Sequence, residues 1–224
     1  DIATIVPIFW AGKLIGWAFN DDAVFASATV EYRKKHAQSV DFYGVNVFQA
    51  EQLSSALDPW LKSKQSDAAR PILMTEYGLP ATGHRDPNDW LSIYADADTI
   101  KRTANAVGKL IPKAFEHPSV TGMFYFEWSD EWWKQPGDGN RVDRQEGIRV
   151  SNDFPNKFWD EEGFGLYSIA LGDRAANQVY TDNWGGKGGN LQVDKLTPRT
   201  ELLDTVVSAF KNAEQTRQNA LGPK

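Results

Sequence analysis

Short apolar runs alternate with helical patterns in the first part of the chain, and this alternation limits the possible folds more than any other feature. Four runs have the length and composition of buried strands, at residues 14–19, 41–48, 71–75 and 122–128. Helical patterns lie between them, at residues 23–38, 51–64 and 96–115. Because parallel strands need crossover connections, usually helices, this order predicts an α/β fold with a parallel sheet. Polar residues gather where each strand ends, which is typical of a (β/α)8 TIM-type barrel or a doubly wound sheet.

Residues 2–19 are apolar enough to raise the question of a membrane span. Pro7, Gly12 and Lys13 interrupt the stretch, whereas a spanning helix needs about 20 predominantly apolar residues. We therefore expect two buried strands here, at residues 5–10 and 13–19, and no membrane span. Asp1 is not an initiator methionine, so we expect a chain that was processed or that is part of a longer protein.

The character of the sequence changes between residues 129 and 200, which are rich in Gly and Asp and have scattered aromatic residues. Loops of this length in a compact domain are commonly lids or binding walls. A final helix is predicted to end near residue 215, and the residues from Arg217 on look frayed. Its expected apolar face consists of Leu202, Leu203, Val206, Val207 and Phe210. The expected organisation is one partial barrel-type catalytic domain at residues 1–216 and a C-terminal tail at 217–224.

Composition excludes several classes of function. The chain has 24 Lys and Arg against 30 Asp and Glu, a formal charge of −6. It has no basic run longer than the three residues 33–35, which argues against nucleic acid as the main partner. With no cysteine, disulfides, thiol nucleophiles and thiolate metal sites are excluded. The sequence has neither a phosphate-binding glycine motif nor a serine nucleophile elbow, so nucleotide-dependent enzymes and α/β-hydrolases are disfavoured.

Glu76 is the strongest single candidate for chemistry. It follows directly on the buried run at residues 71–75, so its carboxylate is expected at the rim of the sheet, where a ligand can reach it. The alternative is a strand-end glutamate in a salt bridge or a capping contact. The whole string Pro-Ile-Leu-Met-Thr-Glu-Tyr-Gly at residues 71–78 favours the functional interpretation.

That string resembles the seventh strand of retaining glycoside hydrolases of the large clan with (β/α)8 barrels. Residues 41–46 resemble the sixth strand of this clan and residues 122–128 the eighth, and β-1,3-glucanosyltransferases and β-galactosidase-type barrels have similar strings. The resemblance implies a glycosidase in which Glu76 is the catalytic nucleophile. It further implies a sugar subsite formed by Tyr43, Asn46, Tyr77 and Trp128.

Two departures from the clan's pattern matter. The clan usually has Asn-x-Tyr after the sixth strand, where this chain has Asn46-Val47-Phe48, so the tyrosine contact to the nucleophile is missing or comes from Tyr43 or Tyr77. The clan's acid/base Glu follows an Asn, and no Asn-Glu pair occurs in this sequence. A retaining reaction needs a second carboxyl about 5–5.5 Å from the nucleophile, to protonate the leaving oxygen and then activate water.

The strand count offers an explanation, since the matching strands are only about the fifth to the eighth of a barrel. The other half could be a separate segment or chain, a second copy could supply it, or the loops of this chain could supply the missing acid. The acids that could serve are Glu127, Asp130, Glu131, Asp160, Glu161 and Glu162. Glu127 is the first choice, because it lies at the end of the strand nearest to the seventh.

Indoles and carboxylates alternate closely in two segments. Glu127, Trp128, Trp132 and Trp133 belong to residues 127–133, and Glu162 belongs to the aromatic segment at residues 158–167. Sugar rings pack C–H faces on indoles and pair their hydroxyls with carboxylates, so we expect Glu127, Trp128, Trp132 and Glu162 to bind substrate. The alternatives are core positions for these indoles and a plain loop anchored by its aromatic residues at 158–167.

We thus predict a retaining glycosidase acting on a β-linked glucan or a related polysaccharide, with no cofactor and no metal, located outside the cell, in the periplasm or in the cell envelope. A transglycosylase shares the same covalent intermediate. The rival hypothesis is a carbohydrate-binding barrel without catalysis. His36, His84 and His117 are dispersed, and we expect surface or capping roles for them.

Overall fold

The computed structural model describes residues 16–20, 41–48, 53, 71–86, 93–131, 149–159, 163–169 and 196–222. The chain divides into two compact units. The first holds the main sheet, the end of helix α4 from Pro112 on, and helix α6. The second holds the segments 78–111 and 126–212. The strands expected at 5–10 and the helices expected at 23–38 and 51–64 lie outside the described residues, apart from the buried Leu53.

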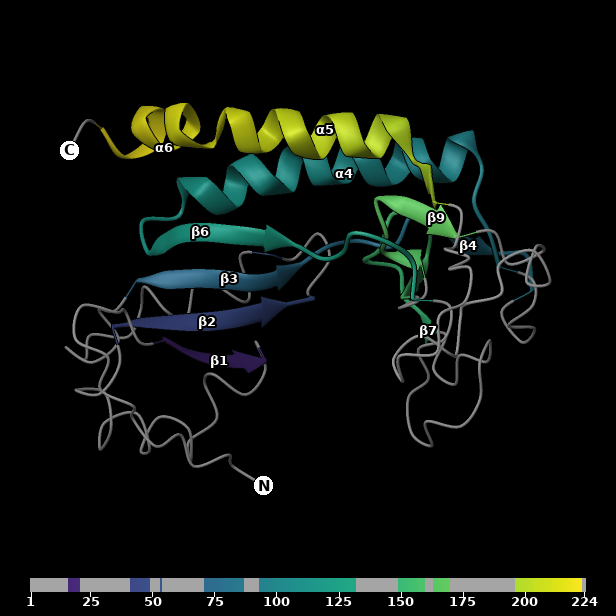
Figure 1. Cartoon of the computed structure of the whole chain (residues 1–224), viewed down its shortest axis with the longest axis horizontal. Helices are drawn as coiled ribbons and strands as arrows, with labels where there is room; N and C mark the ends of the chain where they lie inside the picture. Colours follow the sequence, from purple (N-terminus) through teal and green to yellow (C-terminus); the bar gives the residue numbers. More distant parts are fainter. Residues whose placement is uncertain are drawn as a thin grey trace, which may run out of the picture. The chain divides into compact units, whose positions relative to one another are not determined.

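The first unit contains a four-stranded parallel sheet (Figure 1). Its strands are β1 (Gly16–Asn20), β2 (Phe42–Val47), β3 (Ile72–Tyr77) and β6 (Val120–Tyr125). They pair in chain order, each parallel to the next. This confirms the parallel α/β architecture that the alternating pattern predicted. Closure into a barrel stays a prediction.

Two strand boundaries differ from the expected ones. Strand β3 continues through Tyr77, so Glu76 belongs to the strand and does not follow it. Strand β6 ends at Tyr125, so Trp128 lies in the segment after the strand. The pairing explains both shifts, because Tyr77 and Tyr125 are register partners and carry the ladder between β3 and β6 to that point.

The buried face of the sheet comes from alternate residues on β2, whereas register shifts interrupt the alternation on β3 and β6. On β2, Tyr43, Val45 and Val47 are at most 3% exposed. On β3 and β6 the buried residues are Ile72, Met74, Tyr77, Val120 and Met123. The opposite face is more open, since Phe124 of β6 keeps 60% of its surface exposed.

Helix α6 (Ala213–Leu221) belongs to the same unit as the sheet. The guanidinium of Arg217 donates to the carbonyl of Val120, at the start of β6, and to that of Pro118 at 3.0 Å. The expected frayed tail is therefore wrong as far as Leu221. Sequence reasoning missed this helix because its apolar content is low. Polar hydrogen bonds, and not a buried apolar stripe, hold the segment in place.

Helix α4 (Ala97–Glu116) confirms the helix expected at 96–115. Asp96 caps it: its carboxylate accepts from the Thr99 amide at 2.8 Å, and its own amide donates to the Thr99 hydroxyl at 2.9 Å. Reciprocal bonds of this kind satisfy amide groups that a helix start leaves without intrahelical acceptors.

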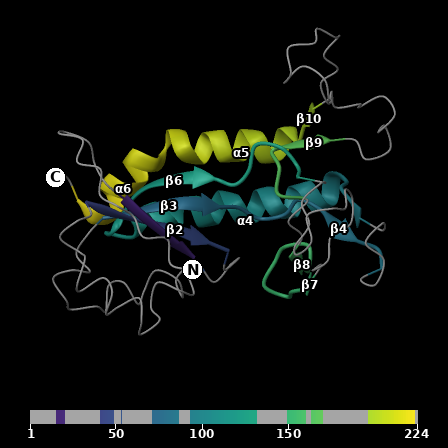
Figure 2. The same ribbon diagram turned by 60° about the horizontal axis from the view of Figure 1, so that its bottom comes forward.

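Helix α5 (Thr200–Lys211) lies beside α4, as both views show (Figures 1 and 2). A Cβ at Gly108 of α4 would stand 3.1 Å from the Thr205 methyl of α5, so the helices approach closely there. The buried residues of α5 are Leu202, Val206 and Ala209, which agrees in part with the predicted apolar face.

Three small antiparallel pairs complete the second unit. They are β4 (Gly83–His84) with β5 (Ile93–Tyr94), β7 (Arg149–Val150) with β8 (Phe158–Trp159), and β9 (Tyr167–Ile169) with β10 (Leu196–Pro198). The last two pairs lie in residues 129–200, for which the sequence predicted loops, and the first pair lies between β3 and α4. In the part of the chain that the structure describes, none of the helices has the length and apolar character that crossing a bilayer requires.

Candidate active site

A β-bulge surrounds Glu76. Met74 and Glu76 of β3 pair with the consecutive residues Val45 and Asn46 of β2, so β3 has one extra residue, Thr75, at this point. The register of β3 with β6 is interrupted in the same place, between Met74 and Tyr77. A bulge adds a residue to one strand and redirects the side chains that follow it.

The bulge determines which way the carboxylate of Glu76 faces. In a regular strand, residues 72, 74 and 76 share one face, and Ile72 and Met74 are at most 1% exposed on the buried face. Here Tyr77 takes the next buried position, at 0% exposure, and Glu76 is only half-buried. The extra residue therefore keeps a charged group out of the core at the carboxyl end of the strand.

Asn46 and Thr75 join β2 to β3 beside Glu76. The Thr75 hydroxyl donates to the Asn46 side-chain oxygen at 2.6 Å, and Asn46 is the register partner of Glu76. Since the oxygen of the Asn46 amide already accepts a hydrogen bond, its NH₂ group is the part that can donate to a bound hydroxyl or to a carboxylate. The structure thus brings together the predicted residues Asn46 and Glu76.

The two predicted tyrosines occupy the core. Tyr43 and Tyr77 are both 0% exposed, and Tyr43 is in register with Ile72, near the start of β3. Tyr77 follows Glu76 directly but takes the buried face. Their direct contact with a sugar stays a prediction.

A second group of predicted residues lies in the segment that follows β6. Glu127 is half-buried, while Trp128 keeps 60% of its surface exposed. The ring of Trp128 lies on that of Tyr167, with centroids 4.5 Å apart and planes inclined by 35°. An exposed indole supported from one side by a second ring offers its other side to a ligand, an arrangement that suits the C–H face of a sugar.

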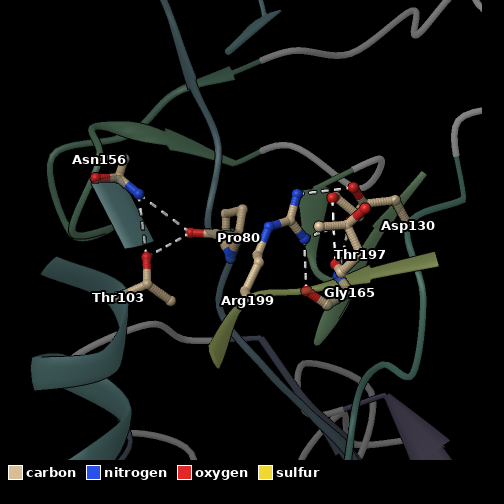
Figure 3. Close-up of polar contacts among 8 residues, drawn as sticks. Pro80, Thr103, Asp130, Asn156, Gly165, Thr197 and Arg199 are labelled. Carbon is tan, nitrogen blue, oxygen red and sulfur yellow. Dashed lines mark hydrogen bonds and ion pairs between the residues drawn. The ribbon is translucent and has the colours of Figure 1, made fainter. Parts of the chain in front are cut away.

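Asp130 has a structural role that argues against acid/base catalysis. Its two carboxylate oxygens accept from the two terminal nitrogens of Arg199, at 2.6 and 2.7 Å (Figure 3). The Gly165 amide donates to one of the same oxygens at 3.0 Å. Both oxygens are thus occupied in a buried ion pair, so Asp130 is a poor proton donor for a leaving group. Glu127 and Glu131 stay as candidates within the described residues.

Several predicted residues cannot be placed. Trp132 and Glu162 lie outside the described residues, as do Trp133, Asp160 and Glu161. The described part of the aromatic segment contacts the residues after β6, since the ring of Phe164 lies edge-on to Phe126 at 5.6 Å. Glu76 and Asn46 belong to the first unit, Glu127 and Trp128 to the second.

The two described histidines differ in role. His84 is 6% exposed and its ring lies 5.1 Å from that of Phe158, so the surface alternative is wrong for this residue, and the capping alternative stays a prediction. His117 accepts from the Ser119 amide at 3.3 Å, which is a local contact in the turn after α4. His36 lies outside the described residues.

Three residues of these groups were missed by sequence reasoning. Thr75 had a signal, because it is a polar residue that breaks a buried apolar run. Tyr167 had one too, as the last residue of the predicted aromatic segment. Arg199 had none, since its partner Asp130 is 69 residues away in the sequence.

Comparison with solved structures identifies the kind of fold. An exo-β-agarase aligns with a TM-score of 0.50 at 12% identity, covering 92% of this chain and 20% of its own. The agarase AgWH50C aligns with a TM-score of 0.50 at 15% identity, covering 91% and 23%. The fold is glycosidase-like. A β-glucuronidase from Bacteroides uniformis aligns less well, with a TM-score of 0.40 over 70% of this chain at 13% identity.

The chain spans only about a fifth of the length of these agarases. No protein-family model matches the sequence, and no curated protein does. At such low identity the likeness concerns the fold alone.

Proposed function

We propose that this chain is part of a retaining glycoside hydrolase that acts on a β-linked polysaccharide, with Glu76 as the nucleophile. The bulge in β3 is the observation that carries the proposal. It holds a carboxylate at the end of a central strand of a parallel sheet, half-buried, next to an amide that can donate. The carboxyl ends of parallel strands are where α/β enzymes bind their ligands.

The chemistry follows from the groups on these strands. The Glu76 carboxylate attacks the anomeric carbon and forms a glycosyl ester, while a second carboxyl protonates the departing oxygen; water then hydrolyses the ester with that second group as base. An Asn46 NH₂ donor next to the nucleophile suits a sugar hydroxyl near the reacting centre, where a hydrogen bond can strengthen in the transition state. Asp130 does not take the second role, because Arg199 occupies both of its carboxylate oxygens.

The substrate class follows from the aromatic pair and from the agarase fold. Trp128 on Tyr167 presents a flat apolar surface, which suits the C–H face of an uncharged pyranose better than a charged or extended ligand. We therefore propose a neutral β-linked galactan or glucan, cleaved within the cell envelope or outside the cell. Transglycosylation would use the same intermediate with a sugar as the acceptor.

A non-catalytic carbohydrate-binding protein is the second candidate. The exposed indole of Trp128 favours it, because an aromatic platform binds sugar without any contribution from Glu76. The two candidates differ in what happens at the Glu76 carboxylate.

Covalent labelling distinguishes them. The protein is incubated with 2-deoxy-2-fluoro-β-galactosyl and -glucosyl fluorides, which trap a glycosyl ester, and is then digested for mass spectrometry. A label on the peptide containing Glu76, absent in Glu76→Gln and retained in Glu116→Gln on the exposed side of α4, supports the hydrolase. A label on another carboxylate overturns the assignment of Glu76. Oligosaccharide binding that is unchanged by Glu76→Gln, with no label, supports the binding protein.

A further inference from the structure

The ion pair between Asp130 and Arg199 is a buried charged contact in the second unit. The side chain of Arg199 is 3% exposed and that of Asp130 is 10% exposed. The guanidinium makes the two parallel bonds of a bidentate pair, with an additional bond from its Nη1 to the Gly165 carbonyl at 2.5 Å. Such a fork fixes both position and orientation.

Around this pair, backbone hydrogen bonds join the segment after β6 to the segment before β9. The Leu166 amide donates to the Glu127 carbonyl, the Tyr167 amide to the Trp128 carbonyl, and the Asp130 amide to the Tyr167 carbonyl, each at 3.0 Å. The Arg199 amide donates to the Leu166 carbonyl at 2.9 Å. Three segments distant in the sequence thus meet at Arg199.

The joined segments carry the aromatic pair. The amide of Tyr167 donates to the carbonyl of Trp128, so the backbone bonds align the two rings that lie 4.5 Å apart. Asp130 is two residues from Trp128, and Gly165 is two residues from Tyr167. A shift of either segment would therefore change the stacking directly.

A buried ion pair is weak evidence of a role in stability, because its desolvation costs about as much as its Coulomb attraction returns. Fixing one geometry among several is the better-supported use of such pairs. We propose that Asp130 and Arg199 are positioning residues, which hold Trp128 on Tyr167 as the glycan platform. The inference rests on the proposed sugar binding at Trp128 and deepens it.

The chain offers a matched control within the same unit. The Thr103 hydroxyl donates to the Pro80 carbonyl at 2.8 Å and accepts from Asn156 at 3.0 Å, also in a buried network (Figure 3). None of these three residues belongs to the segments that carry the rings. Thr103→Val removes a buried polar contact in the second unit without touching the platform.

The first measurement is hydrogen exchange and does not depend on any ligand. Arg199→Lys keeps the charge but loses the fork. We expect exchange in peptides covering 126–131 and 163–169 to rise at least tenfold in Arg199→Lys and less than twofold in Thr103→Val. An equal rise in both variants, or no rise in Arg199→Lys, would overturn the positioning role.

The second measurement is the affinity for neoagarotetraose and laminaritetraose by calorimetry. Arg199→Lys is expected to weaken binding about tenfold in the wild-type background and less than twofold in a Trp128→Ala background, while Thr103→Val changes it less than twofold. Equal weakening with and without Trp128 would overturn the inference. If the wild-type protein binds neither sugar, the proposed function fails, and the exchange result alone decides whether the pair positions the rings.

Discussion

Gly165 lies where the segment before β9 contacts the backbone after β6. Its replacement by alanine tests how closely these two segments must pack. A Cβ at this position would stand 2.3 Å from the Asp130 amide nitrogen, 2.5 Å from the Ser129 carbonyl carbon and 2.6 Å from the Tyr167 carbonyl oxygen. Real Cβ atoms essentially never lie within 3.0 Å of heavy atoms outside their own residue and its two chain neighbours. All three atoms belong to the backbone, so the clash cannot be relieved by rotating a side chain.

The expected cost follows from the contacts that must give way. Forcing an extra carbon into a packed site costs about 1–3 kcal/mol. Separating the segments also weakens the Gly165 amide bond to Asp130 and its neighbours, at about 1 kcal/mol for each bond lost. We expect Gly165→Ala to destabilise the second unit by about 3 kcal/mol, which lowers the ratio of folded to unfolded protein more than a hundredfold.

Gly122→Ala is the matched control. A Cβ at Gly122 would meet one atom, the Leu73 Cδ1, at 2.8 Å, and this methyl group lies at the end of a rotatable side chain. Both substitutions remove the same conformational freedom from the unfolded chain, so their difference reports the steric term. We expect Gly122→Ala to cost less than about 1 kcal/mol.

Urea denaturation followed by circular dichroism gives the free energy of unfolding of each variant. Hydrogen exchange of peptides from each unit shows where stability is lost, since a chain with two units need not unfold in one step. Free energies within about 0.5 kcal/mol of each other for the two variants would refute the reasoning, because they would mean that the segments can separate at little cost.

Four further outcomes are expected. Glu76→Gln should lower kcat on an oligosaccharide at least a thousandfold with little change in binding; retained turnover would exclude it as the nucleophile. Thr75→Val should lower kcat about tenfold through Asn46 and stability by about 1 kcal/mol; unchanged kinetics would show that this hydrogen bond has no part in the reaction. Trp128→Ala should weaken oligosaccharide binding about tenfold in calorimetry. An affinity equal to that of the wild-type protein would contradict the role of Trp128 as a sugar platform. Arg217→Ala should raise hydrogen exchange across α6, and unchanged exchange would show that other contacts hold this helix.

The parallel sheet could be predicted because its signals are local. Each strand is an apolar run, and the crossover helix α4 has a helical periodicity and a capping residue, Asp96, that are both visible in the sequence. Consecutive strands of a chain commonly lie next to each other in a sheet, as these four do. The bulge could not be predicted, since one extra residue in β3 is defined only relative to the neighbouring strands. It nevertheless decides whether Glu76 faces the core.

The second unit was harder to predict for a physical reason. Its order depends on contacts between segments that carry no periodic pattern, such as Asp130 with Arg199 and Trp128 with Tyr167. The sequence indicated the aromatic residues and acids but not their partners, so Asp130 looked like a possible proton donor. The surface role predicted for His84 was wrong for a similar reason. A single polar residue next to a turn has the same local sequence pattern whether its side chain is exposed or buried.

The two groups of residues also differ in what substitution can reveal. Glu76 and Asn46 are held by the ladder of a sheet, where the register is fixed by every neighbouring pair, so a polar substitution there changes chemistry more than geometry. Trp128 is held by a few long-range bonds centred on Arg199, so its orientation can be lost while the sheet stays intact. Variants of Glu76 and Asn46 should therefore lower turnover without changing the affinity for the sugar. Variants of Asp130 and Arg199 should mainly lower that affinity. Such a separation is expected of a glycosidase whose nucleophile and sugar platform are supported independently, and a binding protein would show only the second effect.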